Sequence, residues 1–436
     1  MTSIKSAKKA VAFLRELRYA ILKGNLALRR CGRRKGQPRV FLLGLDGAES
    51  TILFDNPELP NLQGIARRGT YGELVSVDPP ITAPAWTSLF TGKEPDTHGV
   101  LDFHLPLKCK SCGREPARWE FYNECPECGS HVGKRLVSAR DIHGRRLWQI
   151  LADEGLTSGL LNVPVTWSNP LLPVHGWLIS GMMTPGPHAN YSYPAYIKPC
   201  HLRGYKLDVM GQDAHIDSRI NSHELVLDVE RVHRVAKAVI HNRWAFLRKM
   251  MTLYSNDFTF AVFTAADRLQ HVAWHRQDLI LDFWRELDDI VDQIYQFALG
   301  CGYTHFFVVS DHGFCAVDSP AAQHHLRRCG KPGMNHYGVH RLEGIYIATG
   351  DGIVANHRLD GVSILDIAPT LLNTFGLPVP ADMDGHLATA LFQDARQELQ
   401  SYAKETPDES PTEGDQYSAE EASEVTNRLR GLGYIE

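Results

Sequence analysis

The sequence of 436 residues contains no run of about 18 or more apolar residues, so it predicts no helix that spans a bilayer. It also lacks an uninterrupted apolar stretch near its N-terminus, because Arg15, Glu16 and Arg18 break the pattern, and we therefore expect no secretory signal. Cysteine is scarce, with nine residues, and the odd number argues against a disulfide framework. Reduced thiols and a cytoplasmic location are expected.

Acidic residues are almost missing from residues 1–39. This segment holds twelve Lys or Arg residues and a single acid, Glu16, so the rest of the chain carries a net negative charge. Its apolar residues could share one helical face, which predicts an amphipathic helical extension. Three partners fit this pattern: an anionic membrane surface, nucleic acid, or a protein that covers the apolar face while the charges stay solvated. The third is the simplest alternative.

From Val40 onward, short apolar runs alternate with helical stretches, which predicts an α/β fold with a mostly parallel, buried sheet. The expected strands are VFLLGL, SGLLNV, WLISG, DFTFAVF, THFFVV and GIYIAT. The expected helices are Leu62–Arg68, Arg146–Glu154, Glu224–Met251, Leu279–Leu299 and Ser363–Phe375. The last of these has Ser363 as a predicted N-cap and Gly376 just beyond its end.

Three of the apolar strands lead into an aspartate: Asp46, Asp267 and Asp311. Ligands bind at the carboxyl ends of strands in open α/β sheets, and three carboxylates at one edge would repel one another unless cations neutralise them. His271 follows Asp267 by four residues, so one helical turn places both on the same face, and His312 directly follows Asp311. Each aspartate alone could be a turn residue or a helix cap. Together with the histidines they favour zinc, manganese or iron, which accept mixed oxygen and nitrogen ligands.

The segment ITAPAWTSLFTGKEPDTHGV, residues 81–100, places the hydroxyl group of Thr82 at the start of a short predicted helix. A helix N-terminus favours a phosphate group, and a nearby divalent ion would favour the nucleophilic alkoxide of the side chain. The alternative is that Thr82 only caps a helix that begins at Ala83. The segment by itself leaves both interpretations open.

These residues and their neighbours resemble the alkaline phosphatase superfamily, in its type I phosphodiesterase/nucleotide pyrophosphatase branch. Within that branch the chain is most similar to the predicted phosphohydrolase/phosphomutase group. The similarity is collinear over Arg39–Leu391 and rests on the motifs GLDGAE, LPNLQGIARRGTYGEL, PPITAPAWTSLFTGKEPDTHGVLDF, LWQILADEG, NVPVTW, ADRLQH, SDHGF, HRLEGIYIATG and SILDIAPTLLNTFGLPVPADMDG. The resemblance implies a three-layer α/β/α sandwich with a mostly parallel sheet.

The resemblance also implies two divalent ions, zinc or manganese, in the active site. One ion would be held by Asp46, Asp311, His312 and the hydroxyl oxygen of Thr82. The other would be held by Asp267, His271 and His340. His336 and His275 are the alternatives for the second set. By the same resemblance, Thr82 attacks phosphorus in line and forms a phospho-threonine intermediate, which water hydrolyses or an alcohol accepts.

One position departs from the pattern of the branch. Its nucleotide pyrophosphatases carry an asparagine after their His-Gly motif that contacts a phosphate oxygen, whereas this sequence has Phe103 there. The candidate substrate-binding positions are therefore Phe103 itself, Asn162 and Arg268, together with the N–H groups beside Thr82. Otherwise the substrate differs from a nucleotide diester. The sequence has no Cys-x-Pro-x-Arg motif, which argues against a formylglycine sulfatase.

Residues 105–135 interrupt the catalytic pattern with two Cys-x2-Cys pairs, formed by Cys109, Cys112, Cys125 and Cys128. Four thiolates at this spacing suit one tetrahedral zinc ion, which would be structural because no coordination position stays open. The alternative is two unrelated thiol pairs or disulfides. We expect a zinc ribbon that acts as a lid, an oligomer contact, a nucleic-acid contact or a small folded staple.

Together these patterns predict a basic extension (1–39), a catalytic domain (40–392) with an inserted ribbon (105–135) and a cap (185–222), and an acidic linker with a short C-terminal helix (393–436). The expected function is that of a two-metal phosphoric-ester hydrolase, phosphodiesterase or phosphotransferase. Its substrate would be a phosphorylated small molecule, nucleotide, sugar or lipid. The alternative is a non-catalytic, phosphatase-like protein that binds nucleic acid or a protein partner through the ribbon and the basic extension.

Overall fold

The computed structural model describes residues 36–114, 124–208, 228–329, 337–397, 400–401 and 416–431. Several sequence predictions fall outside these residues. They concern nearly all of the basic extension, the alternative ligand His336, residues 209–222 of the predicted cap and most of the acidic linker.

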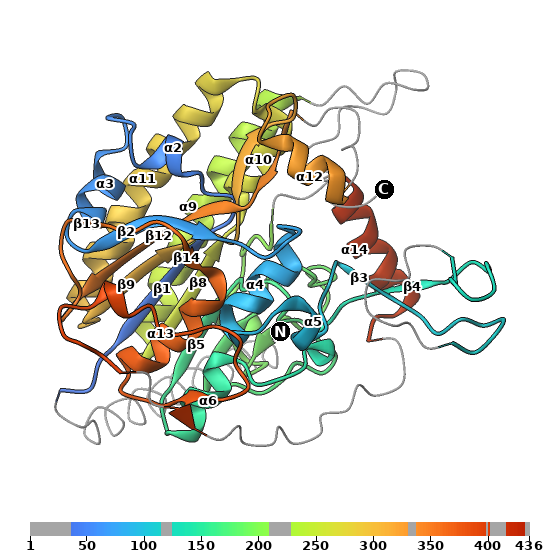
Figure 1. Cartoon of the computed structure of the whole chain (residues 1–436), viewed down its shortest axis with the longest axis horizontal. Coiled ribbons are helices and arrows are strands. Elements are labelled where there is room, and N and C mark those ends of the chain that lie inside the picture. Colours follow the sequence, from blue (N-terminus) through green and yellow to red (C-terminus); the bar gives the residue numbers. More distant parts are fainter. Residues whose placement is uncertain are drawn as a thin grey trace, which may run out of the picture.

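A twisted central sheet organises the fold (Figure 1). Its strands follow the order β13 (His357–Arg358), β2 (Thr70–Val75), β12 (Glu343–Gly350), β9 (His305–Val309), β1 (Val40–Leu45), β8 (Phe258–Phe263), β5 (Ser158–Leu161), β6 (Gly176–Ile179) and β7 (Ser192–Tyr193), and β14 (Val362–Ser363) also pairs with β2. The five strands from β9 to β6 are mutually parallel. Strand β12 runs antiparallel to both of its neighbours, and β7 is antiparallel to β6. The predicted α/β fold with a mostly parallel sheet is confirmed.

Helices cover both faces of the sheet, so the strands are buried on both sides. In β1, Val40 and Leu42 contribute to one hydrophobic core, whereas Phe41, Leu43 and Leu45 contribute to the other. The first core includes residues of α4 (Thr82–Thr91), α6 (Leu147–Asp153) and α13 (Ile367–Thr374). The second includes residues of α3 (Pro60–Ala66), α9 (Val229–Leu253), α10 (Ala265–Ala273) and α11 (Gln277–Gly300). The continuous apolar strand sequences are explained by this three-layer arrangement.

The predicted helices lie within a few residues of the observed ones, with one difference in kind. Ser363 does act as an N-cap, accepting a hydrogen bond from the backbone N–H of Leu365, but it caps a short 3-10 turn, Ile364–Asp366, that precedes α13. Gly376 follows the helix with φ of +72°, a conformation that glycine adopts without strain.

Two hairpins project from the layers. Strands β3 (His104–Pro106) and β4 (Lys134–Leu136) form the hairpin that carries the cysteines. Strands β10 (Gly313–Ala316) and β11 (Gly338–Arg341) form a second hairpin, which carries α12 (Ala322–Cys329). The remaining short elements are α2 (Ser50–Leu53), α5 (Pro95–His98), α7 (Ile197–His201), β15 (Val379–Pro380), β16 (Gln400–Ser401) and the 3-10 turns Ala139–Asp141 and Thr389–Leu391.

Helix α14 (Ala419–Gly431) returns the C-terminal part of the chain to the first core. Val425 and Leu429 are buried there, and the guanidinium group of Arg428 donates hydrogen bonds to the carbonyl oxygens of Thr184 and Pro185. The helix therefore packs as an integral part of the fold beside the β3–β4 hairpin (Figure 1).

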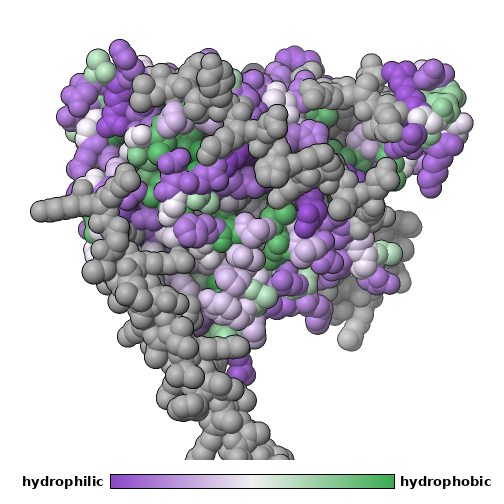
Figure 2. All heavy atoms as spheres, turned by 90° about the horizontal axis from the view of Figure 1, so that it is seen from below, coloured by the Kyte–Doolittle hydropathy of each residue, from purple (hydrophilic) through white to green (hydrophobic). Residues whose placement is uncertain are grey.

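None of the described helices is both long and apolar enough to cross a membrane. The face in Figure 2 is largely hydrophilic, with small apolar areas between polar side chains. Among the described residues, the large hydrophobic side chains with high exposure are Leu299 and Tyr337.

Candidate metal centre

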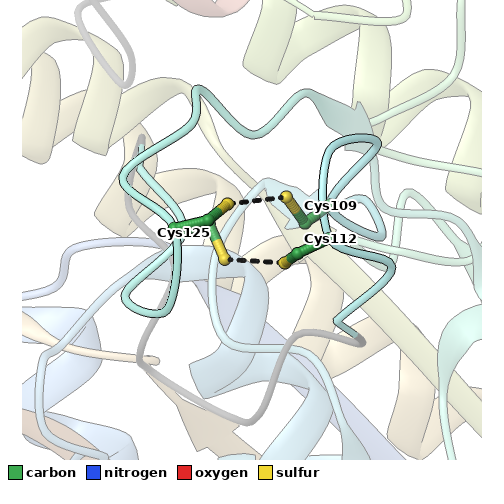
Figure 3. A group of neighbouring side chains, drawn as sticks. Cys109, Cys112 and Cys125 are labelled. Atoms are coloured by element: carbon green, nitrogen blue, oxygen red, sulfur yellow. Dashed lines mark hydrogen bonds between the residues drawn. The ribbon is translucent and has the colours of Figure 1, made fainter.

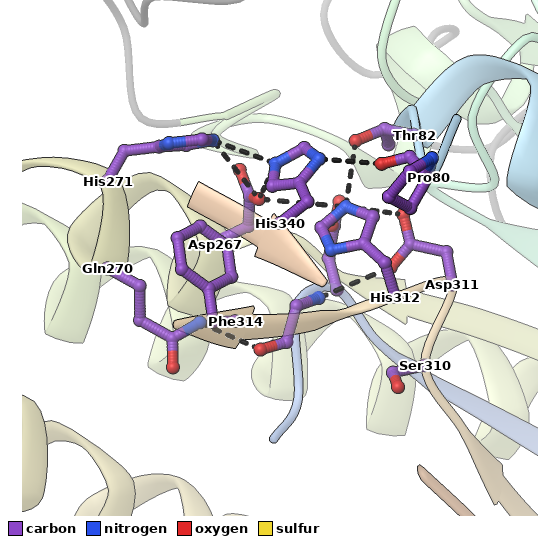
Figure 4. A network of polar contacts seen from close by, with 12 residues as sticks. Pro80, Thr82, Asp267, Gln270, His271, Ser310, Asp311, His312, Phe314 and His340 are labelled. Carbon is purple, nitrogen blue, oxygen red and sulfur yellow. Dashed lines mark hydrogen bonds and ion pairs between the residues drawn. The ribbon is translucent and has the colours of Figure 1, made fainter. Parts of the chain in front are cut away.

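Three neighbouring strands deliver carboxylates to one edge of the sheet. Asp46 follows β1, Asp311 follows β9, and Asp267 lies in the first turn of α10, which begins just after β8. Because β1 pairs in parallel register with both β8 and β9, the three strand ends lie side by side. All three aspartates are completely buried. The structure thus brings together the carboxylates that the sequence placed at strand ends (Figure 4).

Three histidines complete the cluster. His312 follows Asp311, and its Nε2 lies 3.2 Å from Asp311 Oδ2 and 3.7 Å from Asp46 Oδ1. His271 lies one turn after Asp267 on α10, with 3.5 Å between its Nε2 and Asp267 Oδ1. His340 comes from β11, and its Nε2 lies 3.2 Å from the same oxygen. One group consists of Asp267, His271 and His340, and the other of Asp46, Asp267 and His312, so the two groups share Asp267, whereas the sequence analysis assigned Asp267 to one group only.

Each of the three imidazoles is oriented by a main-chain carbonyl group. The Nδ1 atoms of His271, His312 and His340 donate hydrogen bonds to the carbonyl oxygens of Gly338, Gly313 and Pro80, at 3.1, 3.1 and 2.7 Å respectively. A carbonyl oxygen only accepts, so each Nδ1 carries a proton, and in the neutral imidazole the lone pair is then on Nε2. All three Nε2 atoms face the carboxylates, which is the arrangement of metal-binding histidines.

The donor set fits divalent cations. The Nε2 atoms of His271 and His340 are 3.0 Å apart, so when both imidazoles are neutral their lone pairs face each other, and a shared cation would relieve the repulsion. Neither oxygen of Asp46 has a hydrogen-bonding partner among the described residues, although the carboxylate is fully buried. A buried carboxylate in this state is costly, and bound cations would remove that cost.

The electrostatics of the cluster agree with this interpretation. Burial, together with the negative charges of Asp311 and Asp267, raises the pKa of Asp46 well above its usual range. Burial and Asp267 likewise raise the pKa of Asp311. Burial alone would raise the pKa of Asp267, but His271, His340 and Arg268 outweigh it and hold that pKa well below the usual range. The group around Asp46 is therefore short of positive charge.

Thr82 lies over the same cluster, and its Oγ1 is 3.3 Å from Nε2 of His312 (Figure 4). The alternative that Thr82 merely caps a helix is wrong. The helix begins at Thr82, the N-cap position belongs to Ile81, and no side chain caps it. Thr82 thus already has helical backbone geometry, and its hydroxyl group is directed at the acidic cluster instead of at the N–H groups of the helix.

The three candidate substrate-binding residues have different environments. Phe103 is buried in the first hydrophobic core. Asn162 is fully buried and uses its Nδ2 to donate a hydrogen bond to the carbonyl oxygen of Val262. Arg268 lies next to the cluster, where its guanidinium group contacts the carboxylates of Asp267 and Asp208. The alternative ligand His275 is exposed and lies against the Tyr337 ring at a tilt of 42°, so the structure does not bring it into either group.

Two buried acids beside the cluster had no role in the sequence analysis. Glu49 accepts a hydrogen bond from the backbone N–H of Phe314 and pairs with Arg341, so it anchors both strands of the β10–β11 hairpin that carries His340. Asp208 contacts Arg268 from 60 positions earlier in the chain. Glu49 belongs to the GLDGAE motif, which was the only sequence signal for it, and nothing local in the sequence points to Asp208.

The four cysteines of the β3–β4 hairpin meet at its tip (Figure 3). The Sγ atoms of Cys109 and Cys128 are 3.6 Å apart, as are those of Cys112 and Cys125. All four are free thiols, which rules out the predicted alternative of disulfides. Four sulfurs at about 2.3 Å from one tetrahedral zinc ion lie roughly 3.8 Å apart, so the cluster has nearly the required dimensions.

The backbone supports the same geometry through two matching turns. Gly113 donates its N–H to the carbonyl oxygen of Cys109 at 2.9 Å, and Gly129 does the same to Cys125 at 2.8 Å. Both glycines have positive φ, of +76° and +68°, which closes each Cys-x2-Cys pair into a knuckle.

One family of known proteins matches most of the sequence. The model of a family described as type I phosphodiesterase / nucleotide pyrophosphatase matches residues 40–430. No protein with a curated description matches the sequence significantly. Among solved structures, human ectonucleotide pyrophosphatase / phosphodiesterase 5 is similar at 12% identity, over 82% of this chain and 100% of that chain, with a TM-score of 0.49.

Proposed function

Because the chain belongs to the type I phosphodiesterase / nucleotide pyrophosphatase family of phosphoric-ester hydrolases, we propose that it cleaves a phosphoric ester through a covalent intermediate on Thr82. The observation that carries this proposal is the position of the Thr82 hydroxyl, which lies at the first turn of α4 and over six buried Asp and His side chains. A threonine that served only the helix would have no reason to face this cluster.

The protein's own groups prepare the substrate for attack. The first N–H groups of a helix have no partners within it, so the start of α4 offers donors to a phosphoryl oxygen beside Thr82. The turn before α4 is held in place because Pro80 accepts the hydrogen bond from His340 Nδ1. The nucleophile and the Asp267 group are thereby fixed relative to each other, which favours an in-line approach to phosphorus.

The reaction then has two balanced halves. Oγ1 of Thr82 forms a bond to phosphorus as the bond to the departing alcohol breaks, and the hydroxyl proton leaves with that alcohol. Water subsequently attacks the phospho-threonine, which releases the phosphate product and restores the threonine. An alcohol in place of water would give group transfer. Divalent ions at the two Asp/His groups would neutralise the charge that develops on the phosphoryl oxygens.

The substitution Thr82→Ala tests the assignment. It should reduce turnover of an artificial aryl phosphodiester by several orders of magnitude while leaving the site metals bound, because the remaining ligands are intact. Thr87→Ala is the matched control, since Thr87 is also a buried threonine on α4 but bonds to the carbonyl oxygen of Ala83. Mass spectrometry of acid-quenched enzyme should detect, on the peptide that contains Thr82, the phosphoryl group of the substrate with its remaining ester group. Full activity of Thr82→Ala would refute the proposal.

For the cysteine cluster we propose one structural zinc ion. The β3 and β4 strands have only three residues each, and such a short hairpin has little stability of its own. Bound zinc would join the two knuckles and act as a staple. Substitution of Cys112 and Cys128 together by serine should remove one zinc per chain, measured by elemental analysis, and make the hairpin more sensitive to protease. Unchanged zinc content in that variant would contradict this assignment.

A further inference from the structure

We propose that Arg268 and Asp208 form a buried positioning pair, which orients the carboxylate of Asp267 toward the metal ion that it would share with His271 and His340. This inference rests on the proposed function, because the orientation of Asp267 matters only if that carboxylate binds a metal.

The two oxygens of Asp267 face different partners. Nη1 of Arg268 lies 2.7 Å from Oδ2, whereas Oδ1 faces the Nε2 atoms of His340 and His271 at 3.2 and 3.5 Å. The carboxylate cannot rotate without breaking a short, charge-assisted hydrogen bond to the guanidinium group. Arg268 therefore fixes which oxygen is presented to the imidazoles.

Asp208 fixes the guanidinium group in turn. Nη2 of Arg268 lies 3.0 Å from Asp208 Oδ2, and Asp208 Oδ1 accepts a hydrogen bond from the hydroxyl of Thr264 at 3.0 Å. Thr264 is the N-cap residue of α10, the helix that carries Asp267. The chain of contacts thus starts and ends at the beginning of one helix. It needs the planar fork of arginine, because a lysine ammonium group could not hold both carboxylates in this geometry.

A direct role for Arg268 in phosphate binding fits the structure less well. Its side chain is completely buried, with 0% exposure, and its two terminal nitrogens are directed at carboxylates. A substrate group that displaced these contacts would leave both carboxylates buried without their cation, which is strongly unfavourable. Positioning is therefore the role that the contacts support.

The pair also connects the metal centre to the predicted cap. Asp208 directly follows Lys206 and Leu207, which pack on α9. There, Asn242 Oδ1 accepts a hydrogen bond from the backbone N–H of Lys206, and Arg243 donates one to the carbonyl oxygen of Leu207. Arg243 is a useful comparison, because it is a second buried arginine that donates to the carbonyl oxygen of Leu207 in this segment, whereas Arg268 donates to Asp267 directly.

Binding of Mn²⁺ alone, followed by calorimetry, tests the pair without reference to catalysis. Manganese prefers oxygen and imidazole ligands over thiolates, so the cysteine cluster should not interfere. Loss of a residue that orients a metal ligand typically weakens metal binding about 10- to 100-fold. We expect a loss of about tenfold or more at one of the two sites for Arg268→Lys and for the double variant Asp208→Asn/Arg268→Gln. The matched control Arg243→Lys should keep the wild-type affinity.

The double variant keeps the test decisive if Arg268→Lys does not fold, because it removes both buried charges of the pair together. Circular dichroism establishes folding for each variant. Wild-type Mn²⁺ affinity in folded pair variants would overturn the inference. Unchanged affinity with a reduced kcat/KM would also overturn it, since Arg268 would then act on the substrate. A wild-type protein that binds no Mn²⁺ would instead refute the proposed function itself.

Discussion

Removal of the site cations should destabilise the protein, and Asp46→Asn should reverse part of that loss. Asp46, Asp267 and Asp311 are all completely buried at one edge of the sheet. Without cations, Asp46 faces the charges of the other two carboxylates, and neither of its oxygens has a hydrogen-bonding partner among the described residues. An asparagine at this position keeps the shape of the side chain but carries no charge.

The expected size of the effect follows from binding linkage. An ion present at about 100 times its Kd stabilises a folded protein by about 2.7 kcal/mol, so two ions contribute about 5 kcal/mol. The unfolding entropy of roughly 390 residues in the matched span 40–430 is about 0.8 kcal/mol/K, at about 2.1 cal/mol/K per residue. Chelation should therefore lower Tm by about 7 °C or more.

The sign for Asp46→Asn depends on the cations. In the chelated protein the variant should melt above the wild type, because a buried, repelled carboxylate has been removed. With cations present the variant should melt below the wild type, because a ligand has been lost. Asp55→Asn is the control, since it makes the same chemical change at an exposed position and should alter Tm little in either state.

Thermal melts followed by circular dichroism, with and without a chelator, give all of these values. Chelation would also remove the zinc ion proposed for the cysteine cluster, but this cluster is identical in every variant, so differences between variants report on the Asp/His site. The reasoning fails if chelated Asp46→Asn melts at or below chelated wild type, because the carboxylates would then not be repelling one another.

Three further outcomes are expected. The chelated protein should lose stability as pH rises from about 4, the ordinary carboxyl range, through the raised pKa values of Asp46 and Asp311. The reason is that the folded state holds protons on these carboxyl groups that the unfolded chain releases. Thermal melts across this range should show less pH dependence for Asp46→Asn. Gly44→Ala should lower the free energy of unfolding in urea by about 1–3 kcal/mol or more, because the added Cβ would lie 2.5 Å from the Trp86 ring. An unfolding free energy equal to that of the wild type would show that the core relaxes around the added methyl group. Tyr417→Phe should lower the free energy of unfolding by about 1–3 kcal/mol in the same assay, because the buried hydroxyl of Tyr417 lies 3.0 Å from the carbonyl oxygens of both Val137 and Met183. An unchanged free energy of unfolding would mean that other donors replace the hydroxyl.

The layers of the fold were readable from the sequence because the central strands are buried on both faces. Such strands are continuous apolar runs, as in VFLLGL for β1 and THFFVV for β9. Boundaries were harder to predict. The N-cap residue of α4 is Ile81, and not Thr82, which the sequence left open as a cap. The start of this helix depends on the preceding turn, which is held by a hydrogen bond between His340 and Pro80, residues 260 positions apart.

The site was predictable wherever its residues obey a local spacing. Asp267 and His271 share a helical face, and Asp46, Asp311 and His312 follow strands whose ends must meet at one edge. Asp208 could not be found in this way, because it reaches Arg268 only through tertiary packing and lies in no strand, helix or motif of its own. The orientation of each imidazole was equally hidden, since carbonyl acceptors leave no trace in side-chain identity.

The carbonyl groups behind the three histidines cannot be deleted by a side-chain substitution. Many metal-binding histidines rely on a neighbouring carboxylate, which a single substitution can delete. Here the acceptors belong to the main chain at Gly313, Gly338 and Pro80, and every amino acid carries a carbonyl group. The backbone at the two glycines is nevertheless tightly enclosed, because a Cβ atom would lie 2.0 Å from the carbonyl oxygen of Glu343 at Gly313 and 2.6 Å from that of Gln270 at Gly338. Random drift and engineered libraries should therefore disturb the imidazoles through substitutions at these glycines, which move the backbone, and not through loss of an acceptor.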